Sequence, residues 1–156
     1  MTPLPSPRTL FESSYPVAVT LLFWAALSWV GVASVLGDGA RGAGLAMGAL
    51  AAVAAGRSLA PSVTIPAWND LSTVFRVNVR VGVAVLGWVV VALVVDVLGH
   101  NWERFGLPGL FTSPVADLHW ALTWTAVGTG AVYAVAVAAS MRRMPARRDA
   151  GAADGD

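Results

Sequence analysis

Residues 16–36 read PVAVTLLFWAALSWVGVASVL, and this stretch decides how the chain must fold. No charged residue occurs between Glu12 and Asp38. An α-helix rises about 1.5 Å per residue, so roughly 20 apolar residues are needed to cross about 30 Å of hydrocarbon. The stretch has that length, and it therefore predicts a helix that spans a membrane.

Three further apolar stretches follow, at residues 39–59, 81–98 and 118–141. The chain has 156 residues, of which 56% are hydrophobic and 12% are charged, and this composition is too apolar for an ordinary soluble domain. The predicted fold class is all-α. We expect an integral membrane four-helix bundle that forms a single transmembrane domain over residues 16–141.

The chain has no lysine, and its arginines are distributed unevenly between the two ends of the predicted spans. If the chain crosses four times, only Arg41 and Arg104 fall on one side. The opposite side then holds Arg8, Arg57, Arg76, Arg80, Arg142, Arg143, Arg147 and Arg148. Loops rich in arginine stay in the cytoplasm. The bias predicts a multi-pass protein of the cell membrane with both termini cytoplasmic.

The segments outside the spans differ in character. Residues 1–15 and the basic, then acidic tail 142–156 are expected to be disordered in the cytoplasm. Residues 65–79 predict a short helix in the cytoplasmic interface, with one apolar side made by Ile65, Trp68, Leu71, Phe75 and Val79. A membrane surface is the favoured contact of this side, and a partner protein is the alternative. The apolar outer loop 99–117 is expected to cap the bundle.

Small residues recur every four positions along the second predicted span. They are Gly44, Gly48, Ala52 and Gly56, which share one helix face. Small residues let a neighbouring backbone approach closely, and such packing holds helices together in lipid. Two packing partners are possible for this face. Another span of the same chain is favoured because four helices must pack together, and a second copy of the chain is the alternative.

Polar residues gather at the predicted outer ends of the third and fourth spans. They are Asp96, His100, Glu103, Asp117 and His119. Carboxylates and imidazoles suit Zn, Mn or Fe, so this set is the candidate site for a divalent metal. The ordinary alternative is that polar residues cluster where helices leave the membrane. Gly99 also opposes the continuous helix that the spacing from Asp96 to Glu103 requires.

The function that these features favour is that of a non-enzymatic accessory or scaffold subunit of a membrane assembly. No carboxylate, histidine or arginine lies near the middle of a span, which counts against a proton-coupled transporter. No phosphate loop or catalytic motif is present, and the formal net charge of +1 argues against nucleic acid. The expected partners are the lipid bilayer and other membrane subunits or further copies of the chain.

Two other functions remain open for this sequence. One is a small oligomeric channel or transporter, and the other is a membrane protein with an outer-face metal site. Apart from that metal, no cofactor is expected. Trp24 and Trp88 lie deep in their spans, so each indole N–H needs a hydrogen-bond partner or a helix to pack against.

Overall fold

The computed structural model describes residues 5–29, 39–63, 70–102, 104 and 112–153. The regular structure in these ranges is helical, which confirms the predicted all-α class. The elements in chain order are α1 (Pro7–Ser13), α2 (Tyr15–Leu27), α4 (Gly39–Leu59), the short 3₁₀ helix η2 (Ala60–Ser62), α5 (Leu71–Trp102) and α6 (Thr112–Ala153).

Three segments within these helices are long and apolar enough to cross a membrane. They are Gly39–Ser62, Leu71–Asn101 and Pro114–Arg143. Helices α1 and α2 pass the same test only as a pair, and they are bent by 40° at the break between them. The chain therefore has the helices of a membrane protein, with three continuous candidate spans and one broken candidate.

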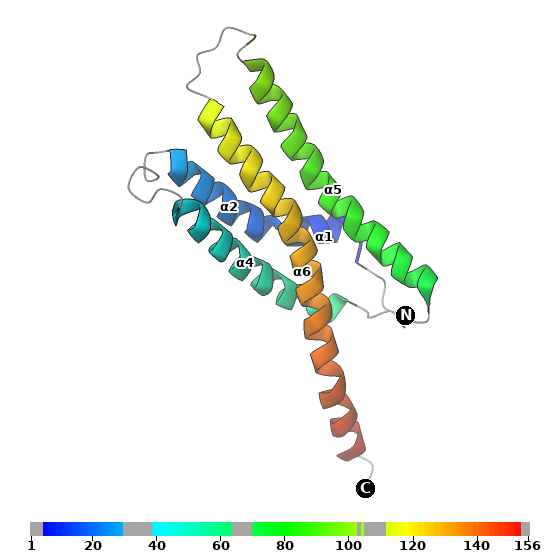
Figure 1. Ribbon diagram of the computed structural model, residues 1–156. Coiled ribbons are helices and arrows are strands. Elements are labelled where there is room, and N and C mark those ends of the chain that lie inside the picture. Colours follow the sequence, from blue (N-terminus) through cyan, green and yellow to red (C-terminus); the bar gives the residue numbers. More distant parts are fainter. Residues whose placement is uncertain (1–4, 30–38, 64–69, 103, 105–111, 154–156) are drawn as a thin grey trace.

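Helix α6 occupies the centre of the arrangement, because it packs against α2, α4 and α5. Helices α2 and α4 lie side by side, and α5 stands at the edge, where it contacts α6 and α1 (Figure 1). The end of α4 and the start of α5 lie at the same end of the bundle (Figure 1). The C-terminal half of α6 extends beyond the other helices at that same end (Figure 1).

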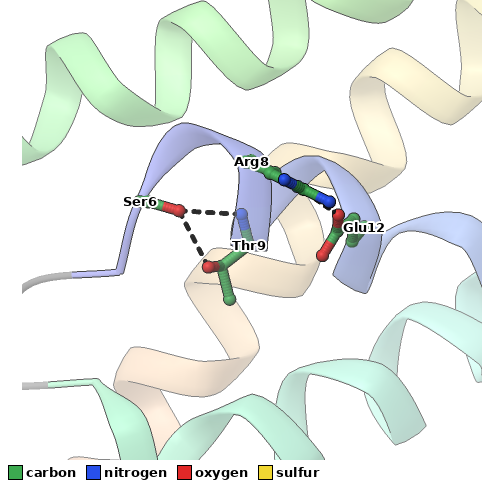
Figure 2. A network of polar contacts seen from close by, with 4 residues as sticks. All are labelled: Ser6, Arg8, Thr9 and Glu12. Carbon is green, nitrogen blue, oxygen red and sulfur yellow. Dashed lines mark hydrogen bonds and ion pairs between the residues drawn. The ribbon is translucent and has the colours of Figure 1, made fainter.

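Helix α1 forms where disorder was expected for residues 1–15. Ser6 caps it, since its hydroxyl accepts a hydrogen bond from the backbone N–H of Thr9 at 3.1 Å and lies 2.8 Å from the Thr9 hydroxyl (Figure 2). Pro7 occupies the first turn, where a missing N–H costs nothing. Arg8 forms an ion pair with Glu12 at 2.7 Å, one helical turn later (Figure 2).

Burial of one side chain anchors α1 to the rest of the bundle. Leu10 is almost completely buried and belongs to the same apolar cluster as Leu59 of α4 and Val132 of α6. The break that follows has a local cause. Pro16 has no N–H to donate to the carbonyl of Glu12, so one hydrogen bond of a continuous helix is missing at this point.

Two other helices also run further than the sequence predicts. The part of the predicted interfacial helix 65–79 that the structure describes is the beginning of α5, so it continues into the third span without a turn. Residues 64–69 lie outside the described part of the chain. Helix α6 continues to Ala153, through most of the tail that was expected to be disordered. Extending an existing helix needs no new nucleus, and alanine and arginine are strong helix formers.

Candidate functional site

An ion pair joins α4 and α6 at the end of the bundle where both helices begin. Arg41 Nη2 donates a hydrogen bond to Asp117 Oδ1 at 2.8 Å. The Asp117 side chain is 9% exposed, whereas that of Arg41 is 52% exposed. A buried carboxylate is costly without a partner. The guanidinium meets that requirement while half of its surface stays accessible.

His119 connects α6 to α5 at the same end. Its Nδ1 lies 3.1 Å from the backbone carbonyl oxygen of Ala92. Because a carbonyl only accepts hydrogen bonds, Nδ1 carries the proton in this contact. Nε2 lies 3.5 Å from the hydroxyl of Thr123, which donates to the His119 carbonyl at 2.9 Å. The ring therefore serves as a tie between two helices.

The described residues of the predicted metal site lie on two helices, α5 and α6. Asp96 and His100 are exposed on α5, which continues through Gly99 despite the glycine. Asp117 and His119 face different helices, as their partners Arg41 and Ala92 show. Among the described residues, no three His, Asp or Glu side chains form a group that could hold a metal ion. Glu103 lies outside the described residues, so the five-residue site stays a prediction.

The row of small residues on α4 faces the interior of the same chain. Gly44, Gly48, Ala52 and Gly56 are all buried. A Cβ atom added to Gly44 would lie 3.0 Å from the Cβ of Trp24, and one added to Gly48 would lie 3.2 Å from a methyl group of Leu21, so both glycines meet α2. At Gly56 the partner is α6 instead, where an added Cβ would meet Val132 and Val135. The row thus packs within the chain, first on α2 and then on α6.

A buried hydrogen bond connects the break between α1 and α2 to α5. Trp88 Nε1 donates to Ser14 Oγ at 2.8 Å, and that hydroxyl donates to the Phe11 carbonyl at 2.6 Å. Phe11 stacks on Trp88 with a ring-centroid distance of 4.4 Å, and Tyr15 meets Trp88 edge to face. The sequence indicated that Trp88 needs a partner but did not identify Ser14. The feature of the sequence that could have identified Ser14 is Pro16, because a proline predicts a helix break next to this serine.

An apolar groove opens between α2, α4 and α6, with a volume of about 220 Å³. Its walls are made by Val17, Leu21, Leu45, Gly48, Ala49, Ala52, Trp124, Val127, Gly128 and Ala131. A smaller hollow of about 160 Å³ lies between α2 and the first turns of α6, beside Trp29 and Leu118. Neither hollow has a charged residue in its wall, so what they can receive is hydrocarbon.

Comparison with known protein families, with curated proteins and with solved structures found no match. The helices that are able to cross a membrane define the class of protein, which is a helical membrane protein.

Proposed function

We propose that this chain is an accessory or scaffold subunit of a larger assembly in the cell membrane, without enzymatic activity of its own. In this proposal the pair α1–α2 and the helices α4, α5 and α6 make four spans, and both termini are cytoplasmic. The arginine distribution supports this orientation, because Arg57 at the end of α4 and Arg76 near the start of α5 belong to the end of the bundle from which α6 extends (Figure 1).

The observation that carries the proposal is the exposure of the first turns of α5. Leu71 is 77% exposed and Phe75 is 70% exposed, the highest values for large apolar side chains in the described part of the chain. They precede Val81, where the apolar run of α5 begins, and exposed Arg76 lies between them and it. At this level the membrane surface or a partner protein can cover large apolar side chains, and we propose that a partner covers them.

The rest of α5 is also less covered than α4 or α6. Of the membrane-length window in α5, 17% is buried, compared with 33% in the window of α4 and 39% in that of α6. Helix α5 thus presents a long apolar side that the chain itself leaves open. A subunit that acts by packing against another membrane protein needs such a side, and its start offers the specific contact.

The test is site-specific photo-crosslinking in native membranes. A photoreactive amino acid replaces Phe75, and the control carries it in place of Leu50, an exposed residue in the middle of α4. We expect a discrete adduct with a different membrane protein from position 75 and only lipid adducts from position 50. Adducts with a second copy of the chain would favour the oligomeric channel instead. Lipid adducts alone at both positions would reject the accessory role.

The orientation has its own test. A reporter enzyme fused after Asp156 is expected to be active only in the cytoplasm, because an even number of crossings returns the chain to the side on which it began. Activity on the outer side would mean that the number of spans is odd.

A further inference from the structure

The ion pair and the apolar groove lie on the same side of α4. Arg41, Leu45 and Gly48 are spaced by four and three residues, so they follow one another along one helix face. Arg41 precedes Leu45, the first groove residue of α4, by about 6 Å along the helix axis. On α6, Asp117 precedes the groove residue Trp124 by seven residues, which is two turns.

The lining of the groove limits what can fill it. Its walls carry apolar side chains and no charged residue, and it is open on one side, so a hydrocarbon chain can enter laterally. The groove residues belong to the central parts of α2, α4 and α6, so lipid chains are what surrounds its opening. An empty apolar hollow would forfeit the dispersion contacts of its walls.

The charge next to the groove selects the polar end of the occupant. Arginine has five N–H donors, and the contact with Asp117 engages one nitrogen, Nη2. Half of the Arg41 side chain is exposed, so the guanidinium can donate to a second oxyanion while Asp117 holds it in place. Arginine binds phosphate oxygens through such paired donors.

We infer that α2, α4 and α6 form a binding site for one anionic phospholipid, with its phosphate on Arg41 and one acyl chain in the groove. The carboxylate of Asp117 positions the arginine and does not contact the lipid. Gly48 and Gly128 let α2 approach closely, because an added Cβ would meet Leu21 at Gly48 and Val17 at Gly128. Trp124 supplies an aromatic surface for the chain.

The test measures lipid binding to the full chain in detergent by native mass spectrometry. Dioleoylphosphatidylglycerol is expected to bind at one molecule per chain. Dioleoylglycerol, which lacks the phosphate, and glycerol phosphate, which lacks the chains, are expected to bind about tenfold more weakly or not at all. Equal binding of dioleoylglycerol would overturn the role of Arg41. Equal binding of glycerol phosphate would show a phosphate site without a lipid and overturn the role of the groove.

Two variants separate the two halves of the site. Ala49→Leu places a larger side chain in the wall of the groove, and Ala46→Leu, on the exposed surface of the same helix outside the groove, is its control. The double variant Arg41→Gln with Asp117→Asn removes the phosphate partner without leaving a buried charge unpaired. We expect both Ala49→Leu and the double variant to weaken phosphatidylglycerol binding about tenfold. Unchanged binding in either one, with Ala46→Leu as the reference, would refute the site.

Discussion

Gly56 on α4 is the position where one added methyl group should do the most damage to the bundle. An alanine Cβ there would lie 2.6 Å from the backbone oxygen of Val132 and 2.6 Å from the Cβ of Val135. Carbon atoms normally approach to about 3.5–4.0 Å, so α6 would have to move away by about 1 Å. Overpacking of this kind costs about 1–3 kcal/mol. The upper half of that range is expected, because a backbone oxygen cannot rotate away as a side chain can.

The control for Gly56→Ala is Gly130→Ala, because no atom lies within 4 Å of the added Cβ at Gly130. Replacing glycine by alanine in a helix gains up to about 1 kcal/mol of propensity, and this gain is common to both variants. The two should therefore differ by about 1–3 kcal/mol in the free energy of unfolding. Titration with sodium dodecyl sulfate, followed by near-ultraviolet circular dichroism, measures this difference. Equal midpoints would refute the close packing of α4 on α6.

The remaining predictions concern three other parts of the molecule. Ser14→Ala should lower the free energy of unfolding by about 1–3 kcal/mol, because it leaves the buried N–H of Trp88 without an acceptor; an unchanged unfolding midpoint would contradict this. Hydrogen bonds from Thr73 and Ser72 lower the pKa of Asp70 from 3.8 to about 2. The Asp70 cap should therefore stabilise α5 above pH 3.8, and this stabilisation should be lost as the pH falls through about 2. The carboxyl signal of Asp70 in a nuclear magnetic resonance titration measures the pKa. Elemental analysis of protein purified without a histidine tag should find no stoichiometric divalent metal. The result that would contradict this is one ion per chain that is lost in the double variant His100→Ala with His119→Ala and on acidification below about pH 6.

The existence of the long helices was predictable because lipid imposes a simple rule on composition. A run without charges that is long enough to cross the membrane must be a helix, since every backbone group has to be paired internally. The row of small residues on α4 was predictable for a similar reason, because its four-residue spacing defines a face. The helices that this row contacts were not predictable, since the sequence does not show which helix packs against Gly44 and which against Gly56.

Helix α1 was missed although its capping signals are present in the sequence. Ser6 followed by Pro7 is a typical helix start, and Arg8 and Glu12 have the spacing of an ion pair. The three prolines in this segment favoured disorder instead. What decides the outcome is the burial of Leu10 in the core, a tertiary contact that no local pattern reveals.

The polar end of the bundle shows why a cluster in the sequence need not be a cluster in space. Asp117 and His119 are two residues apart on α6, and at 3.6 residues per turn this separates their directions by about 200°. Asp117 consequently meets α4 through Arg41, whereas His119 meets α5 through the carbonyl of Ala92. Because α6 lies between these two helices, residues on its opposite faces tie it to both neighbours. Their spacing therefore favours the joining of helices over shared ligation of one ion, and Arg41, which Asp117 holds in place, keeps about half of its side chain exposed.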